Sequence, residues 1–449
     1  MKNDKSVNDK NVISKNIKDD DAIYSVKGMS KGKILLLGLQ HTFAMFGATV
    51  LVPLLTGLSV STTLLMAGLG TLLFHFITKR KVPAFLGSSF AFLGGYAAVA
   101  PLIDGQPNVE MLPYASGGVF VAGLVYVVLA ALIKFFGVKK VMRFFPPVVT
   151  GPIIIAIGLI LAPTAISNCQ QNWILALIAL AVIIICNIWG KGMIKIIPIM
   201  LGIVVSYIVA IFMGEVDFSS FGSSAIVALP VSTSAFAKFD ISAIITIVPI
   251  ALATMMEHIG DISAIGATTG KNYIASPGLH RTLIGDGIAT SFSALFGGPA
   301  NTTYGENTGV LALTKVYDPL VMEIAAVCAI ILSFFPVVAN LISSIPTAII
   351  GGVSLILYGM ISAIGIRNVV ENRIDFTESR NLIIAAVILV SALGLNEIGG
   401  ITFTVVGTVI NLSGLAIAAI VGILLNAILP GNDYAFEVED EHDELTFKV

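Results

Sequence analysis

Two carboxylates, Glu257 and Asp261, lie four residues apart in an otherwise apolar stretch of the chain. If that stretch is a helix, the spacing places both side chains on one face. Two neighbouring carboxylates in a medium of low dielectric constant resist being ionised together, so one of them tends to keep a proton near neutral pH. Such a group can take up and release a proton and can accept hydrogen bonds from the N–H groups of a ligand. His258 points about 100° away from Glu257 and is either a packing histidine or a direct participant.

A third acid, Glu306, directly follows Tyr304 and Gly305 in a segment rich in Gly, Pro, Asn and Thr. A backbone turn that carries a carboxylate and an aromatic ring is suited to hold a planar polar ring. Apart from Lys134, near the end of the segment Gly118–Phe136, the apolar segments contain no Lys or Arg, so Glu257 and Glu306 have no buried base to neutralise them. A bound proton is the simplest alternative, because a charge inside a membrane is costly. For the other acids of this half we expect positions close to a membrane surface and no special role: Asp286, Asp318 and Glu323.

The composition excludes several classes of protein. The chain has 449 residues, of which 56% are hydrophobic and 12% charged, and its mean hydropathy is +0.95. A soluble domain carries about 25% charged residues, so this chain cannot cover a water-facing surface of its size. The near balance of 25 basic and 27 acidic residues offers no basic face for nucleic acid. The three cysteines have no metal-ligand spacing, and we find no catalytic motif, so we expect a polytopic membrane protein that is not an enzyme.

Fourteen apolar segments of roughly the length that crosses a bilayer follow one another along the chain. With the N-terminal tail placed in the cytoplasm, 24 of the 25 basic residues fall in tails or loops on that side, as the positive-inside rule requires. We therefore expect both termini in the cytoplasm. The predicted segments are Ile34–Leu58, Thr62–Thr78, Val82–Leu102, Gly118–Phe136, Pro147–Ala165, Trp173–Trp189, Ile196–Met213, Ile241–Ala264, Thr282–Gly297, Pro299–Leu313, Leu320–Ile342, Ala348–Ile366, Leu382–Leu395 and Leu412–Leu429.

The third and tenth segments share an interruption by Gly, Pro, Ser, Asn and Thr, at Val82–Gly95 and Gly297–Asn307. They are seven segments apart. Because seven is odd, the second half of the chain would lie upside-down relative to the first, as in an inverted-topology repeat. Interrupted segments in corresponding positions are the best sequence pointer to the midplane site of a transporter. Glycines that merely permit close helix packing are the alternative explanation.

From Gln40 to about Leu429 the chain resembles the nucleobase–ascorbate transporter family, which includes bacterial uracil permeases. Glu306-Asn307-Thr308-Gly309 followed by Thr314-Lys315 is similar to the signature of this family. The resemblance implies an all-α polytopic fold of 14 segments in two inverted repeats, with short antiparallel strands in segments 3 and 10. The other runs that carry it are Gln40–Val50, Gly87–Phe92, Glu257–Gly260, Pro277–Arg281 and Asn301–Asn307.

The same resemblance implies a core domain and a gate domain, with the substrate held at the boundary between them. The core would comprise residues 34–137 and 241–345, and the gate residues 138–240 and 346–430. A tail of residues 1–33 precedes them, and an acidic cytoplasmic tail, 431–449, follows.

The substrate site implied by the resemblance is formed by both interrupted segments. Glu257 and Glu306 would accept hydrogen bonds from the N–H groups of uracil. The backbone near Phe90 and Gly305 would meet its carbonyl groups, and Tyr358 would face the site from the gate. Further members of this expected set are Ser89 and Tyr304, of which Tyr304 would flank the pocket together with Phe90.

The residue at position 306 helps to distinguish between substrates, because purine transporters of the family tend to carry Gln there and this chain has Glu. Proton coupling is expected to involve Glu257, Asp261 and Glu306. Some uracil permeases of the family have His where this chain has Asp261, so the details of coupling need not transfer.

These observations predict a uracil:H⁺ symporter of the cytoplasmic membrane that works by alternating access. The expected partners are uracil, H⁺ as the coupling ion and the lipid bilayer, with no metal, no other cofactor and no nucleic acid. A homodimer through the gate domains is also implied by the resemblance. The alternatives are a xanthine or purine permease of the same family, and an anion exchanger or channel with the same plan.

Overall fold

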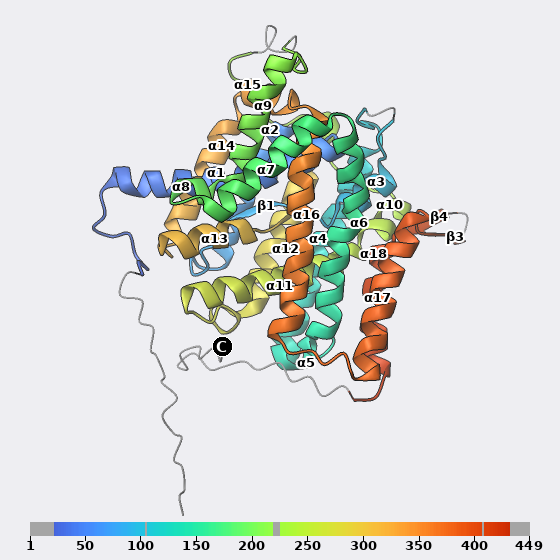
Figure 1. Ribbon diagram of the computed structural model, residues 1–449. Helices are drawn as coiled ribbons and strands as arrows, with labels where there is room; N and C mark the ends of the chain where they lie inside the picture. Colours follow the sequence, from blue (N-terminus) through green and yellow to red (C-terminus); the bar gives the residue numbers. More distant parts are fainter. Residues whose placement is uncertain (1–21, 104–105, 219–224, 406–407, 432–449) are drawn as a thin grey trace, which may run out of the picture.

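The computed structural model of the protein describes residues 22–103, 106–218, 225–405 and 408–431 (Figure 1). Most of these residues are helical, and the longer helices lie side by side in one bundle. The predicted N-terminal tail up to residue 21 and the acidic C-terminal tail from residue 432 lie outside the described residues.

The first half of the chain corresponds to the first seven predicted segments, of which the third is a strand followed by a short helix. Two further short helices, α5 and α8, are connections. In chain order the elements are α1 (Lys31–Thr56), α2 (Val60–Ile77), β1 (Leu86–Ser88), α3 (Leu93–Val99), α4 (Leu112–Phe136), α5 (Val138–Met142), α6 (Pro147–Gln170), α7 (Trp173–Trp189), α8 (Met193–Ile196) and α9 (Pro198–Met213).

The second half repeats this order, again with a strand and a short helix at its third segment. Its elements are α10 (Ile241–Ile247), α11 (Ile250–Thr269), α12 (Leu279–Leu295), β2 (Asn301–Thr303), α13 (Gly305–Thr314), α14 (Leu320–Ser333), α15 (Pro336–Ser343), α16 (Thr347–Glu371), α17 (Ser379–Glu397), β3 (Ile401–Val405), β4 (Thr408–Leu412) and α18 (Gly414–Ile428).

Many helices can cross a membrane unaided. Within the described residues, seven are long and apolar enough: α1, α2, α4, α6, α16, α17 and the stretch Ile241–Thr269 formed by α10 and α11. Three shorter apolar helices are α7, α9 and α18. With α12, the bent pair α14–α15 and the two strand-containing segments, every one of the fourteen predicted segments has its counterpart in the structure.

Two predicted spans are not continuous helices. The eleventh, predicted as one helix over Leu320–Ile342, is bent by 87° between α14 and α15. The bend lies at Pro336, and the preceding Phe335 has the extended backbone that proline favours in its neighbour. The eighth is divided into α10 and α11 at Val248 and Pro249. Prolines without an N–H group to donate explain both interruptions.

The packing of the helices has the internal two-fold symmetry of an inverted repeat. The second segment, α2, packs on the eleventh, α14, and the fourth, α4, packs in the same way on the ninth, α12. The pairs α7–α9 and α17–α18 correspond to each other, as do α7–α16 and α6–α17. The pairs α2–α12 and α6–α16 each relate a helix to its own counterpart. A shift by seven segments therefore maps the contacts of one half onto those of the other.

A β-hairpin between α17 and α18 was not predicted. Its strands β3 and β4 are antiparallel, with Ile401 opposite Leu412. Gly399 and Gly400, which precede it, both have positive φ angles (81° and 89°). Glycine adopts this backbone conformation without steric cost, so the chain can turn sharply as it leaves α17.

Candidate functional site

The two interrupted segments meet as a pair of antiparallel strands, as predicted. Strand β1 pairs with β2 so that Gly87 lies opposite Thr302. Each strand leads towards a short helix, α3 after β1 and α13 after β2. We call β1–α3 the first arm and β2–α13 the second arm. Both strands are buried, so their remaining polar groups need partners within the protein.

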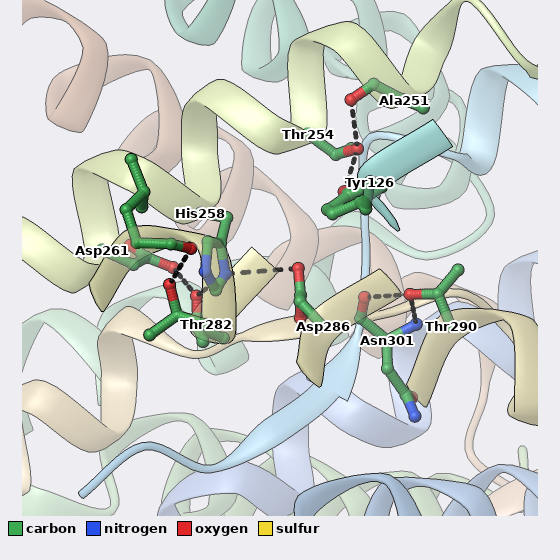
Figure 2. A network of polar contacts seen from close by, with 11 residues as sticks. Tyr126, Ala251, Thr254, His258, Asp261, Thr282, Asp286, Thr290 and Asn301 are labelled. Carbon is green, nitrogen blue, oxygen red and sulfur yellow. Dashed lines mark hydrogen bonds and ion pairs between the residues drawn. The ribbon is translucent and has the colours of Figure 1, made fainter. Parts of the chain in front are cut away.

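A threonine hydroxyl holds the first residue of each strand. Thr71 of α2 accepts a hydrogen bond from the amide of Leu86 at 2.9 Å and donates to its carbonyl at 3.2 Å. Thr290 of α12 does the same for Asn301, at 3.2 Å and 2.7 Å. Figure 2 shows the contact between Thr290 and Asn301. Helices α2 and α12 correspond in the repeat, so the two arms are held by equivalent contacts.

Tyr304 joins the second arm to the first. Its hydroxyl donates to the carbonyl of Ser88 at 3.0 Å, and its ring lies over Gly87, where a Cβ atom would come within 2.4 Å of the ring. The side chain is 4% exposed. Gly87 is therefore required for this close approach, and Tyr304 has a fixed position between the two strands.

The rings of Phe90 and Tyr358 lie close together. Their ring centroids are 6.1 Å apart in an edge-to-face arrangement, a favourable geometry for aromatic pairs. Phe90 follows β1, and Tyr358 belongs to α16. Between them and the strand, Ser89 donates its amide to the carbonyl of Ala300 at 2.9 Å. Its hydroxyl oxygen is buried and has no hydrogen-bond partner among the described residues.

Helix α11 carries two acids, and one of them, Asp261, lies beside the second arm. Asp261 is 9% exposed, and its Oδ2 accepts a hydrogen bond from the hydroxyl of Thr303 at 2.9 Å. A Cβ atom on Gly305 would lie 3.8 Å from Asp261 Oδ1, so the first residue of α13 lies next to this carboxylate. Glu257, one turn earlier, is partly buried. Thr303 carried no predicted role, although it lies in the motif Asn301–Asn307.

Position 306 is the second residue of α13, and the side chain of Glu306 lies outside what the structure describes. The next residue fixes the helix to α1, because the side-chain amide of Asn307 contacts His41 Nδ1 at 3.2 Å and donates to the His41 carbonyl at 3.4 Å. The start of α13 is thus held between α1 and α11. A helix N-terminus favours negative charge and hydrogen-bond acceptors.

A narrow, largely apolar hollow separates the first arm from α6 and α18. It begins at Phe90, next to the strands, and its polar side chains are Asn396 and Ser413. Neither Glu257 nor Tyr304 lines it. The complete lining is Phe90, Ala91, Gly94, Ile157, Ile160, Leu161, Ile250, Asn396, Ser413 and Leu415.

Asp286, for which a position near a membrane surface and no special role were expected, has a buried partner. Its side chain is fully buried in the middle of α12, with Oδ2 3.3 Å from His258 Nδ1 (Figure 2). Helix α12 packs against both α2 and α4, so its central residues face protein on more than one side. His258, for which packing and direct roles were both open, is therefore the partner of a buried acid. A carboxylate in the middle of an apolar segment was the signal that could have identified this pair.

The other two acids match their expectation of an ordinary role. Glu323 pairs with Arg80, with 2.7 Å between Oε1 and Nε, and Asp318 accepts a hydrogen bond from the amide of Val26. Among the described residues, no group of three or more His, Cys, Asp or Glu side chains lies close enough to hold a metal ion. The chemistry available at the arms is that of carboxylates, hydroxyls, backbone amides and aromatic rings.

Comparison with known proteins places this arrangement in a family. A model described as "Permease family" (Xan_ur_permease) matches residues 32–401. The uracil permease of Bacillus caldolyticus is 45% identical over 90% of this chain and 94% of its own length. The uracil permease of Bacillus subtilis (strain 168) is 42% identical over 87% and 91%. That of Escherichia coli (strain K12) is 38% identical over 87% and 90%.

Solved structures support the fold at much lower sequence identity. The transmembrane domain of the cyanobacterium bicarbonate transporter BicA aligns with a TM-score of 0.60 at 16% identity, over 88% of this chain and 96% of that one. SLC26A9 aligns with a TM-score of 0.65 at 12% identity, over 90% and 66%. At this identity the likeness concerns the fold alone.

Proposed function

Since this chain belongs to the permease family, within the nucleobase–ascorbate transporters, we propose that it carries uracil together with a proton across the cytoplasmic membrane by alternating access. The observation that carries this proposal is the sequence identity of 38–45% to uracil permeases along almost the entire chain. The arrangement at the paired strands supports the proposal, because Asp261 accepts a hydrogen bond from Thr303 there and the rings of Phe90 and Tyr358 meet next to the first strand. A transporter, not an enzyme, is the activity that these relatives favour.

Uracil binds in this proposal between the two arms and the gate. Glu257 and Glu306 accept hydrogen bonds from its ring N–H groups, and backbone amides near Phe90 and Gly305 donate to its carbonyl oxygens. Phe90 and Tyr304 flank the ring, Ser89 supplies its buried hydroxyl, and Tyr358 closes the site from α16. Uracil is a flat ring with two N–H donors and two carbonyl acceptors. It therefore matches a site that offers carboxylates as acceptors and backbone amides as donors.

The site lies where two sets of helices meet, and we propose that these sets move against each other. Helices α6, α7, α9, α16, α17 and α18 make their most extensive contacts with one another, and so do α1, α2, α4, α12 and α14. The first set corresponds to the expected gate and the second to the expected core. Movement of one set relative to the other would open the hollow next to Phe90 and expose the strands. The gate is also the proposed surface of a homodimer.

Asp261 is the proposed site of the coupling proton, with Glu257 and Glu306 as partners. It lies beside the start of α13 and is almost entirely buried, so a change in its charge alters the surroundings of the substrate directly. A proton and uracil that both favour one conformation increase each other's affinity, because binding linkage is reciprocal. Uptake of uracil would then be driven by the inward proton gradient, with both termini in the cytoplasm.

Uptake of labelled uracil into cells that express the protein tests the proposal. We expect accumulation that a protonophore abolishes and that unlabelled uracil suppresses. Xanthine, guanine and adenine in excess should leave it unchanged. Suppression by xanthine, with no accumulation of uracil, would instead assign the chain to the purine branch. Bicarbonate and chloride provide a further control, because solved anion transporters share the fold.

A further inference from the structure

The chain before the first helix lies against the ends of two helices that carry the site. Residues 23–26, which we call the N-terminal strap, precede α1 and contact the chain at the ends of α11 and α13. Ile23 forms a parallel bridge with Val316. Its amide donates to the carbonyl of Lys315, and its carbonyl accepts from the amide of Tyr317, both at 2.8 Å. The strap is thus paired through its backbone with the connection between α13 and α14.

The side chain of Tyr24 joins this connection to α11. Its hydroxyl donates to the carbonyl of Thr269, the last residue of α11, at 2.7 Å. The centroid of its ring lies 5.3 Å from that of Tyr317 and 4.4 Å from Nζ of Lys271. Lys271 follows α11 and Tyr317 follows α13, so one side chain contacts the chain at the ends of both helices.

These hydrogen bonds satisfy groups that a helix end leaves unpaired. The last carbonyl groups of a helix have no partner within it. The strap supplies a donor to the carbonyl of Thr269 in α11 and another to that of Lys315, directly after α13. Lys315 also has a φ of 54°, a left-handed conformation that is unfavourable for a residue with a Cβ atom and persists where surrounding contacts fix it. The bond from Ile23 is one of these contacts.

Val26 anchors the strap in the hydrophobic core. Its side chain is 4% exposed, and it belongs to the same hydrophobic cluster as Ile262 of α11 and Leu311 of α13. Its amide donates to Oδ2 of Asp318, in the connection before α14, at 2.8 Å. The strap is therefore held by packing as well as by hydrogen bonds.

The second half of the chain contains a corresponding contact. Lys238 precedes α10 as the strap precedes α1, and its amide donates to the carbonyl of Pro113 at the start of α4, at 2.9 Å. Helix α4 follows the first arm as α14 follows the second. The further partners differ: the segment before α10 bonds to the end of α12, from the amide of Ala237 to the carbonyl of Leu295, whereas the strap bonds to α11, which carries Asp261.

We propose that the N-terminal strap positions the uracil site by holding the C-terminal ends of α11 and α13 together. Helix α13 has ten residues and is about 15 Å long, so a displacement of its C-terminal end also moves its N-terminal end, which lies beside Asp261. Ile23, Tyr24 and Val26 are positioning residues in this inference. It rests on the proposed function, because it concerns how the same site is held in place.

The coupling between the strap and the site is reciprocal. If the docked strap favours the arrangement of α11 and α13 that binds uracil, then bound uracil favours the docked strap by the same factor. A segment that only stabilised the fold, without fixing the site, would lower the melting temperature when it was weakened and leave uracil affinity unchanged. The two roles therefore differ in a measurable way.

Thiol labelling of the purified full-length protein tests this coupling. In Val26→Cys the thiol is buried while the strap is docked, so its rate of reaction with a maleimide reports undocking. We expect saturating uracil to slow this reaction about fivefold or more, the lower end of usual coupling between sites. Lys27→Cys is the matched control, because this neighbouring side chain is exposed and its rate should not change. Both variants carry Cys328→Ala, since Cys328 is partly exposed and the other two cysteines are buried.

Uracil affinity of strap variants provides the second measurement. Ile23→Pro removes the amide hydrogen that is donated to Lys315, and Tyr24→Phe removes the hydroxyl that is donated to Thr269 while keeping the ring. We expect the Kd for uracil to rise about two- to tenfold in each, the equivalent of one hydrogen bond. Lys238→Pro is the control for Ile23→Pro. It should lower the melting temperature to a similar extent and change the Kd less, because its segment does not hold α11.

The outcomes distinguish the inference from the proposed function. Equal labelling of Val26→Cys with and without uracil overturns the inference. So does a wild-type Kd in both Ile23→Pro and Tyr24→Phe, or an equal rise of the Kd in Lys238→Pro and Ile23→Pro. If Ile23→Pro does not fold, Tyr24→Phe and the labelling of position 26 decide the matter. A wild-type protein that binds no uracil contradicts the proposed function instead.

Discussion

The two arms of the site have the same framework and different chemistry. In each, a threonine on the preceding helix binds the amide and the carbonyl of the first strand residue: Thr71 for β1 and Thr290 for β2. The first arm then continues with apolar and aromatic residues around Phe90. The second arm continues through Thr303 into α13, and the hydroxyl of Thr303 donates a hydrogen bond to Asp261.

This difference separates the residues that build the site from those that act in it. Contacts that obey the two-fold symmetry position the strands, since both halves keep them. The contacts of Asp261 and Asp286 have no counterpart in the first half, and they lie on α11, α12 and the second arm. We therefore expect symmetric positions to control stability and asymmetric ones to control binding.

The largest effect should come from the acids of the second half. Glu257→Gln and Glu306→Gln each replace an acceptor of the uracil ring by an amide, and a hydrogen bond to a charged group is worth about 1.5–3 kcal/mol. Binding should weaken roughly 10- to 100-fold, and uptake should fall to background while the protein still reaches the membrane. Uptake assays with a membrane-fraction immunoblot measure both. Unchanged uptake by either variant would remove that residue from the site.

Asp261→Asn should change the coupling more than the binding. The amide cannot take up a proton, so uracil should still bind, but accumulation should no longer respond to an imposed proton gradient. Uptake into proteoliposomes at several values of external pH provides the measurement. A pH profile identical to that of the wild type would place the coupling proton elsewhere.

A matched pair of glycines tests the contact between the arms. Gly87→Ala puts a methyl group into the ring of Tyr304, whereas Gly94 on α3 has no heavy atom within 4 Å of the added Cβ. Overpacking of this kind costs typically 1–3 kcal/mol, so Gly87→Ala should lower the melting temperature and Gly94→Ala should not. Equal melting temperatures would mean that Tyr304 is not held between the strands.

The smallest effect should come from the two threonines. Thr71→Val and Thr290→Val each leave backbone groups of a buried strand unpaired, at about 1–3 kcal/mol, so both should lower the melting temperature to a similar extent. Thr78→Val is the control, because Thr78 bonds only to carbonyl groups of its own helix. Uracil affinity should fall more for Thr290→Val than for Thr71→Val. The reverse order would contradict the expectation that the second arm controls binding more than the first arm does.

Much of the fold could be predicted because interruptions are visible in a membrane sequence. The Gly, Pro and Ser residues of Val82–Gly95 and their counterparts in Gly297–Asn307 indicated the repeat, and the resemblance to the family implied the two strands. The burial of Asp286 was not predicted: its place in the middle of an apolar segment was a signal, but which residue it meets depends on how the helices pack around α12. The 87° bend before α15 and the hairpin after Gly400 do have local signals, Pro336 and the two glycines, but these residues alone set neither the angle of a bend nor the pairing of two strands.

The central claim is that uracil and a proton meet at the carboxylates of the second half. Calorimetric titration of the purified protein with uracil, in two buffers of different ionisation enthalpy, tests it most directly. The account predicts that wild-type binding is accompanied by proton uptake and that Glu257→Gln shows no binding at the same concentrations. Binding of uracil by the wild type without proton uptake, or with equal affinity in Glu257→Gln, would contradict it.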